Sequence, residues 1–328
     1  MTQKNKQVQG LRGISILFIM LFHYSRFLGY SYFDFLCSFG VANFFLISGY
    51  YLNNTTYHGG GELLRRRFDS LYPRYFISIT MIFIITRFFE LQNRTVTFTE
   101  YLLCIPFINA FIGTPYVDGA HWFLKPVLTA TVLCAAIYSV SEYKKNWIYL
   151  IWVVCVAILR VVRFVTGSSG VLVNEHINAV ATILQGFVFD TNTPIIIVGM
   201  LLNNINVVNI TTLVICGLYY YFTSGYEYVL VLIICVVLVL LCVNNKVTLL
   251  EFTPIVAVGN ISYMLFLIHQ NIGYIIINKM QTTQIVSIIV PMIVIIIASA
   301  VLEYGYDKVK VVSRRIFGVL GMNYKSFR

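Results

Sequence analysis

Charged residues are scarce in this sequence: only 11% of its 328 residues are Asp, Glu, Lys or Arg, whereas 59% are hydrophobic. A soluble globular domain carries roughly 25% charged residues, because its surface must face water. The composition therefore excludes an ordinary water-soluble globular fold. Acidic residues are the scarcest charged class, with 13 Asp and Glu against 23 Lys and Arg, and the formal net charge is +10.

The sequence also lacks the patterns that bind nucleic acid, metals or disulfide partners. The basic residues sit in short connections between apolar runs, where they set membrane topology and contact lipid headgroups, so we expect no nucleic-acid partner. The seven cysteines are scattered singly, and no C-x-x-C pair occurs. We therefore expect no metal site and no disulfide framework.

Long apolar stretches with few charged residues recur along the chain, and each is long enough to cross a hydrocarbon core of about 30 Å. We predict an all-α, polytopic transmembrane bundle of about ten crossings. The first begins near the N-terminus without a small-residue cleavage site, which indicates a retained helix. The predicted spans are 11–29, 36–52, 71–91, 121–141, 147–166, 179–203, 207–222, 227–243, 254–277 and 285–306.

The positions of the basic residues predict the orientation of this bundle. An even number of crossings places the N-terminal tail, Arg65–Arg67, Lys144–Lys145, Lys246 and the segment from Lys308 to Arg328 on one side, which the positive-inside rule makes cytoplasmic. Both termini are then cytoplasmic. We expect one membrane-embedded domain over residues 1–328, with no extra-membrane domain, in the cell membrane. Pro194 interrupts the sixth span, and 98–111 is an apolar stretch too short to cross.

The first predicted helix carries two ionisable side chains, Arg12 and His23. Placing a charge in the membrane is costly, so such residues usually serve function. Eleven positions at about 100° each bring the two side chains to nearly the same helix face, separated by about 16 Å along the axis. The alternative for each residue alone is structural: Arg12 can extend to the headgroups, and His23 can be a hydrogen-bonded interior residue.

This pair and four further segments resemble acyltransferase family 3, membrane proteins that O-acylate envelope polysaccharides and related glycans. The similarity runs in order along the chain through residues 12–23 (RGISILFIMLFH), 44–50 (FFLISGY), 65–73 (RRRFDSLYP), 121–124 (HWFL) and 259–269 (GNISYMLFLIH). Two positions depart from the family pattern. Ser70 stands where a second arginine is frequent, and Asp307-Lys308-Val309 replaces a terminal Glu-x-Pro.

The resemblance implies acyl transfer from cytoplasmic acyl-CoA to a glycan hydroxyl, with no permanently bound cofactor. His23 is the predicted base, since neutral imidazole suits deprotonation of an alcohol near pH 7. Arg12 and the run Arg65, Arg66 and Arg67 are predicted to hold the donor phosphates. His269, His121 and Trp122 are the predicted substrate-binding residues. Ser48 and Gly49 are expected to permit close helix packing rather than to take part in chemistry.

Two other functions stay open from sequence. A glycan or small-acid transporter or flippase would use the interrupted span and the buried ionisable residues. A non-catalytic relative would share the motifs without the activity. The expected partners are membrane lipid, acyl-CoA, and a polysaccharide or lipid-linked glycan acceptor. The sequence does not decide the acyl group, the acceptor hydroxyl or the oligomeric state.

Overall fold

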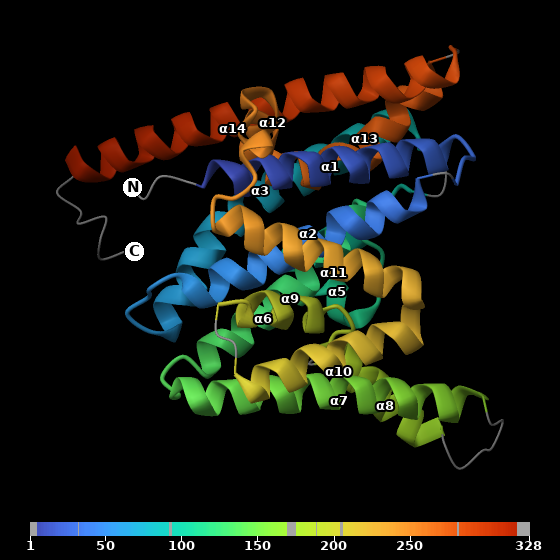
Figure 1. Cartoon of the computed structure of the whole chain (residues 1–328). Coiled ribbons are helices and arrows are strands. Elements are labelled where there is room, and N and C mark those ends of the chain that lie inside the picture. Colours follow the sequence, from blue (N-terminus) through green and yellow to red (C-terminus); the bar gives the residue numbers. More distant parts are fainter. Residues whose placement is uncertain are drawn as a thin grey trace.

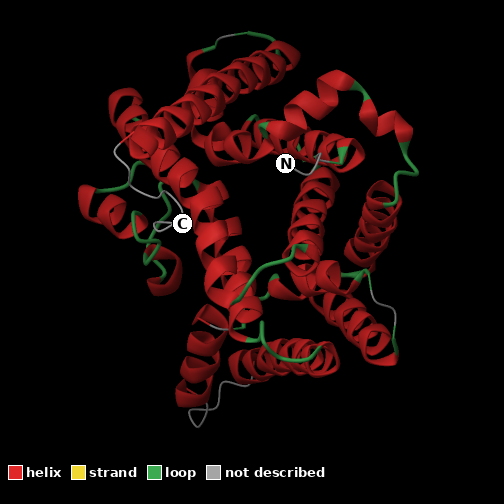
Figure 2. Ribbon diagram, turned by 90° about the vertical axis from the view of Figure 1, so that its left-hand side faces the viewer, coloured by secondary structure: helices red, strands yellow, loops and turns green. Residues whose placement is uncertain are grey.

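A computed structural model describes residues 5–31, 33–91, 94–168, 175–187, 189–203, 206–280 and 282–319. Over these residues the chain is helical and contains no strand, which confirms the predicted all-α bundle (Figure 2). The elements in order are α1 Lys6–Phe27, α2 Asp34–Asn54, α3 Gly60–Phe89, α4 Phe98–Cys104, α5 Asn109–Ile112, η1 Gly119–Phe123, α6 Leu124–Ala136, α7 Glu142–Ser168, α8 Glu175–Phe187, α9 Thr193–Leu201, α10 Val207–Ser224, α11 Tyr226–Val243, η3 Thr248–Glu251, α12 Thr253–Asn260, α13 Ser262–Lys279 and α14 Gln284–Val319.

Among the described residues, 7 helices are long and apolar enough to cross a membrane: α1, α2, α3, α7, α10, α11 and α14. The pair α12 and α13, which bends by 76° between Asn260 and Ser262, makes an eighth if it crosses as one span. The described residues thus hold fewer such helices than the ten crossings predicted. The predicted spans 121–141 and 179–203 consist of shorter helices, η1 with α6 and α8 with α9. The expected interruption at Pro194 is the start of α9, where proline needs no N–H partner.

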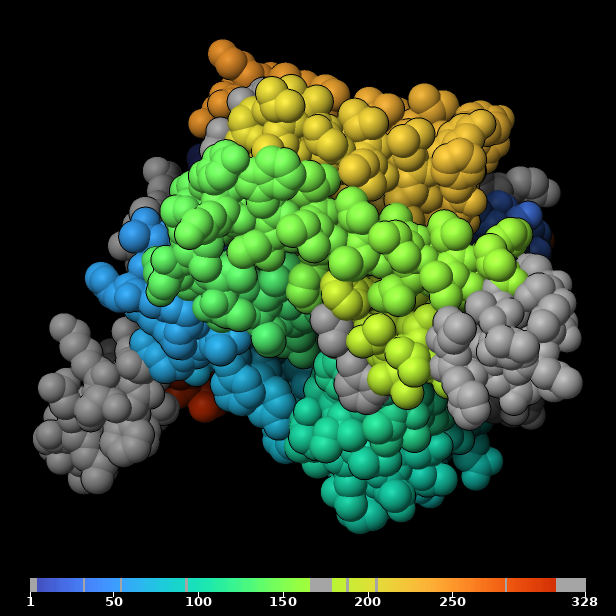
Figure 3. Space-filling view, turned by 90° about the horizontal axis from the view of Figure 1, so that it is seen from below, coloured from blue at the N-terminus to red at the C-terminus, as the bar shows by residue number. Residues whose placement is uncertain are grey.

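The outer surface of the bundle is apolar. Phe164 of α7 is 73% exposed and Phe222 of α10 is 79% exposed, and many aliphatic side chains of α11 and α14 are exposed as well. Figure 3 shows α7 (green) spread across one face, with α10 and α11 (yellow to orange) along one edge. A surface this apolar suits contact with lipid tails rather than with water.

Four helices, α1, α2, α9 and α13, form the buried centre, and glycine brings two of them into close contact. A Cβ built on Gly49 of α2 would lie 1.9 Å from the carbonyl oxygen of Ile196 in α9. One on Gly199 of α9 would lie 2.2 Å from that of Leu46 in α2. Only glycine permits this backbone approach, in agreement with the packing role expected for Gly49.

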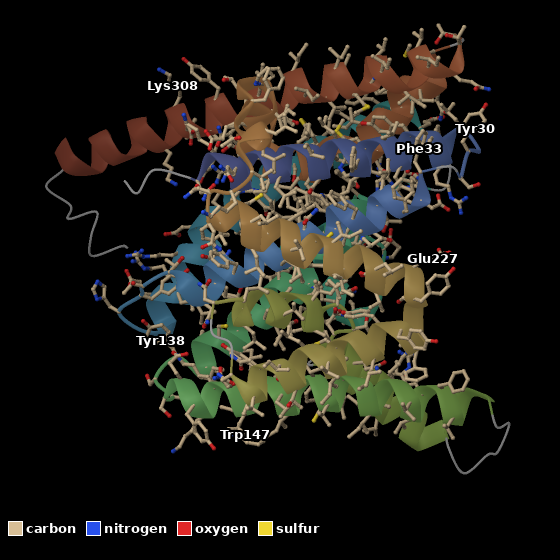
Figure 4. All side chains as sticks on the ribbon, viewed as in Figure 1. Tyr30, Phe33, Tyr138, Trp147, Glu227 and Lys308 are labelled. Carbon is tan, nitrogen blue, oxygen red and sulfur yellow. The ribbon has the colours of Figure 1, made fainter. Side chains whose placement is uncertain are left out.

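The bundle has two distinct ends (Figure 1). The first residues of α1 and the last residues of α14 lie at one end. Figure 4 places Tyr138, Trp147 and Lys308 toward that end and Tyr30, Phe33 and Glu227 toward the other. We call these the Arg12 end and the His23 end, after the nearer residue of α1. The predicted basic connections around 65–67, 144–145 and 308 share the Arg12 end, as the orientation argument requires. Residues 320–328 of the predicted cytoplasmic tail lie outside the described residues.

Candidate active site

Arg12 and His23 lie on one uninterrupted helix, α1. The side chain of Asn5 accepts a hydrogen bond from Val8 N and caps its first turn. Continuous helical geometry sets the axial separation of Arg12 and His23 at about 16 Å. Both side chains face the region of α2 and α13: Arg12 lies 6.0 Å from the ring centroid of Phe44, and His23 contacts α13. The single stripe expected from the spacing is therefore present.

At the His23 end, two imidazole rings from distant parts of the chain lie side by side. The ring centroids of His23 and His269 are 5.2 Å apart. His269 is fully buried on α13, whereas His23 is partly buried. The structure thus joins the candidate base and one of the three predicted substrate-binding residues in one histidine pair.

The hydrogen bond of His269 determines its neutral tautomer. Its Nδ1 lies 2.8 Å from the carbonyl oxygen of Phe266 on the preceding turn. A carbonyl oxygen only accepts, so Nδ1 carries the proton and Nε2 carries the free lone pair of the neutral ring. That Nε2 is buried and has no hydrogen-bond partner among the residues that the structure describes. A buried, unpartnered lone pair is costly in a structural residue but suits a group that receives a proton or a hydroxyl.

Polar groups of α13 surround the other ring. The side-chain amide nitrogen of Gln270 and the hydroxyl of Tyr274 each lie 3.3 Å from Nδ1 of His23. Gln270 also donates to the Tyr274 hydroxyl at 3.2 Å. The guanidinium of Arg94 lies over the Tyr274 ring, 4.6 Å from its centroid. These contacts fix the orientation of the His23 ring and leave its opposite edge free of them.

A short segment before α6 holds this part of α13 in place. The Asp118 carboxylate accepts from Ala120 N and from Asn271 N, each at 2.9 Å. His121 Nε2 donates to the carbonyl oxygen of Leu267, also at 2.9 Å. Burial raises the pKa of Asp118, while the N–H donors favour its charged form. His121 therefore supports the helix that carries His269, and it does not lie beside His23.

At the Arg12 end, a cavity of about 290 Å³ opens between α1, α2, α3, α6, α13 and α14. Arg12, Arg67, Arg74 and Glu303 are the charged residues that line it. Arg74 and Glu303 form an ion pair across α3 and α14, with nitrogen and oxygen 2.5 Å apart. A cavity with this excess of guanidinium groups suits an anionic ligand.

Three aromatic rings that contact one another line the cavity, and one of them reaches the histidine pair. Phe44, Phe123 and Phe266 line the cavity, and their ring centroids lie 4.9 to 6.2 Å from one another. Phe266 also contacts the ring of His269, at 5.7 Å. Phe266 therefore links the cavity to the histidine pair.

The remaining predicted residues are more scattered. Arg66 is ion-paired with Glu62 at 2.6 Å and is half exposed, and neither it nor Arg65 lines the cavity. Trp122 contacts the rings of Phe45 and Phe123 at 5.9 and 6.4 Å. No role at the site was predicted from sequence for Arg74 or Glu303, which both line the cavity. A lone glutamate in the last apolar span is the signal that could have marked Glu303, because an unpaired carboxylate there is costly.

In the part of the chain that the structure describes, no three His, Cys, Asp or Glu side chains are grouped so that they could hold a metal ion. All seven cysteines are free thiols. The polar groups of the site are imidazole, phenol and amide beside the histidine pair, and guanidinium in the cavity.

Comparison with known proteins identifies the family. The family model of an acyltransferase domain matches residues 5–304, which is nearly the whole chain. No curated protein and no solved structure gives a significant match. The matched range includes both residues of the α1 stripe, the cavity and the histidine pair. This chain belongs to the acyltransferase domain family, and it is a membrane acyltransferase.

Proposed function

We propose that this protein transfers an acyl group, in the simplest case acetyl, from acyl-CoA to a hydroxyl of a cell-envelope polysaccharide or its lipid-linked precursor. One observation carries the proposal: α1 runs from a guanidinium-lined cavity to a pair of histidines, and Phe266 both lines the cavity and contacts His269 of the pair. Acyl-CoA has matching parts, with phosphates at one end and a thioester at the end of a thin pantetheine arm.

In the proposed reaction the acceptor oxygen attacks the thioester carbonyl, the new C–O bond forms and the C–S bond breaks. The hydroxyl proton passes to the histidine pair and then to the departing thiolate. His269 takes the hydroxyl proton on its free Nε2. His23, whose Nδ1 accepts from the Gln270 amide, carries its proton on Nε2 and donates a hydrogen bond from it to the thioester carbonyl oxygen. Arg12 and Arg67 hold the phosphates by charge-assisted hydrogen bonds.

The acceptor would approach from the His23 end. A cavity of about 530 Å³ there is lined by Phe27, Phe89, Glu90, Asn278 and Lys279, among others. Phe27 stacks on Tyr274 at 4.2 Å, and Tyr274 contacts His23. Aromatic faces mixed with carboxylate, amide and ammonium groups suit a sugar, which presents C–H faces and hydroxyls. With the basic Arg12 end in the cytoplasm, donor and acceptor would reach the pair from opposite sides of the cell membrane.

The test is acylation of envelope glycans in cells that express the wild type, His23→Ala or Arg12→Ala at equal membrane levels. Mass spectrometry of the glycans measures the acyl groups. We expect both variants to lose acylation, while His58→Ala, an exposed histidine outside the site, retains it. Full acylation by both site variants would show that the assigned roles are wrong.

A transporter for a glycan or small acid is the second candidate. The observation that favours it is the 76° bend between α12 and α13, because broken helices are common at transport sites. Substrate flux into vesicles that contain no acyl donor would support transport. Flux that is absent without a donor, together with acyl transfer when the donor is added, would support the transferase.

A further inference from the structure

An ion pair that the sequence did not predict lies inside the cavity at the Arg12 end. Arg74 Nε donates to both carboxylate oxygens of Glu303, at 3.0 and 2.8 Å. Nη1 of Arg74 donates to the carbonyl oxygen of Ser70, one turn earlier on α3, at 3.0 Å. The two side chains are 15% and 17% exposed. Glu303 and Ser70 therefore fix the guanidinium against the cavity wall.

The other two guanidinium groups of the cavity have weak, neutral partners. Arg12 donates to the side-chain oxygen of Gln9 at 3.5 Å, and Arg67 donates to the carbonyl oxygen of Ser48 at 3.4 Å. Within the described part of the chain, Nε of Arg67 is buried and has no hydrogen-bond partner. Three guanidinium groups against one carboxylate leave two positive charges uncompensated in one enclosed space. Such a space is costly unless an anion fills it.

We infer that this cavity binds a diphosphate ester, with Arg74 as a third binding residue and Glu303 as the positioning residue that holds it in place. A diphosphate joined to an organic group at each end carries two negative charges, which match the two uncompensated positive charges. Its oxygens also match the flat fork of arginine, which binds phosphate through two parallel hydrogen bonds. Acyl-CoA contains such a diphosphate, so its identification as the ligand rests on the proposed function. A lipid-linked diphosphate carries the same chemistry.

The structural alternative is that Arg74 and Glu303 only fasten α3 to α14. The two roles predict opposite results for the partners of the pair. If the ion pair only holds the two helices together, loss of either side chain lowers the stability of the protein equally. Removal of both charges together then lowers the stability less. For a ligand site, Arg74 attracts the diphosphate and Glu303 repels it. Glu303→Gln keeps an amide oxygen that can hold Arg74 and removes the repelling charge, so it preserves or strengthens binding.

The experiment titrates CoA into the purified protein in lipid nanodiscs and measures the dissociation constant by isothermal titration calorimetry. We expect Arg74→Gln and the double variant Arg74→Gln/Glu303→Gln to bind CoA about 10- to 100-fold more weakly, as expected for a lost charged hydrogen bond. Glu303→Gln should bind at least as tightly as the wild type. Arg26→Gln is the matched control, because Arg26 is ion-paired with Asp34 at the other end of α1. Arg74→Gln alone leaves the buried Glu303 carboxylate unpaired, and an unpaired buried charge impairs folding. The double variant removes both charges and so tests binding without that effect.

Further probes test separately whether the cavity binds a diphosphate and whether that diphosphate belongs to acyl-CoA. Pantetheine, which has the thiol arm but no phosphates, should bind the wild type and Arg74→Gln equally. Binding of a polyprenyl diphosphate but not of CoA, with the same dependence on Arg74, would support the diphosphate site and overturn acyl-CoA as the donor. The inference itself is overturned if the wild type binds neither diphosphate. It is also overturned if Arg74→Gln binds like the wild type or if Glu303→Gln weakens binding as much as Arg74→Gln.

Discussion

The two histidines of the site differ in what their ring nitrogens contact. Nδ1 of His269 is used by its own helix, at 2.8 Å from the Phe266 carbonyl oxygen, so its Nε2 is the reactive nitrogen of the neutral ring. Nδ1 of His23 instead faces Gln270 and Tyr274. The roles of the two rings are therefore tested by separate substitutions, one at His269 and one at Tyr274, the partner of His23.

His269→Asn keeps an amide donor near the position of Nδ1 and removes Nε2. We expect this variant to fold and to bind CoA, while acyl transfer falls by about 10²- to 10⁴-fold, the usual contribution of a proton-transfer group. The measurements are CoA affinity and transfer rate on the same purified sample. A transfer rate equal to that of the wild type would rule out a role for Nε2.

Tyr274→Phe keeps the stack on Phe27 and removes the hydroxyl that lies 3.3 Å from His23. Loss of one neutral hydrogen bond predicts a decrease in transfer rate of about 2- to 12-fold, with CoA affinity unchanged. If the rate instead falls as far as in His23→Ala, the phenol takes part directly in the chemistry rather than orienting the ring.

Residues of one helix could be related to each other from sequence, whereas residues on different helices could not. Helical periodicity alone placed Arg12 and His23 on one stripe of α1. The contact of His23 with His269 joins residues 246 positions apart, and the Arg74–Glu303 pair joins residues 229 positions apart. Such pairs depend on how helices are arranged in the bundle, which hydropathy does not encode.

At the scale of the elements, side chains of the segment before α6 hold α13 in place. Asp118 accepts hydrogen bonds from the backbone N–H groups of Asn271 and Ala120, and His121 donates to the carbonyl oxygen of Leu267. These contacts are made beside His269 itself. The short helix η1 therefore positions the histidine pair without contributing a ring to it.

Asp118→Ala would leave two buried N–H groups without their acceptor. We expect a loss of stability of about 1 to 3 kcal/mol for each unsatisfied group, observed as a lower melting temperature in detergent, together with reduced transfer. Asp118→Asn keeps one acceptor oxygen and should lie between alanine and the wild type. An unchanged melting temperature in Asp118→Ala would show that the contact does not support α13.

Two glycines, each inside a helix, allow a matched test of the close contact between α2 and α9. Gly49→Ala places a Cβ 1.9 Å from a backbone oxygen of α9, so α2 and α9 must separate, and we expect less folded protein in the membrane. Gly217 of α10 has open space where a Cβ would lie. Gly217→Ala should therefore be neutral or stabilising by about 0.5 to 1 kcal/mol. Fluorescence-detected size-exclusion chromatography compares the two, and equal folded yields would contradict the close crossing.

The long helices could be predicted from sequence because hydropathy and length alone define them. The elements made of short pieces could not, since α4, α5, η1 and α9 depend on contacts with the rest of the bundle. The bend between α12 and α13 likewise follows no proline or charge at Ile261. The predicted spans over 121–141 and 179–203 are each assembled from shorter helices, and neither is among the helices long enough to cross.

At the scale of the whole molecule, the bundle has a basic end and an end that bears the histidine pair. Single cysteines introduced at Glu227 and at Lys308, in a variant without native cysteines, test how it lies in the membrane. In intact cells we expect a membrane-impermeant maleimide to label Glu227→Cys, while Lys308→Cys is labelled only after permeabilisation. The reverse pattern would invert the proposed sides of donor and acceptor.

The central claim is that the arginine cavity binds the donor and the histidine pair carries out the transfer. Acetyl transfer from labelled acetyl-CoA to envelope glycan, with CoA affinity determined in the same vesicles, tests it most directly. The account predicts that His23→Ala retains CoA affinity and loses transfer, whereas Arg12→Ala loses CoA affinity first. It is contradicted if His23→Ala transfers the acetyl group at the wild-type rate, or if it loses CoA binding as completely as Arg12→Ala.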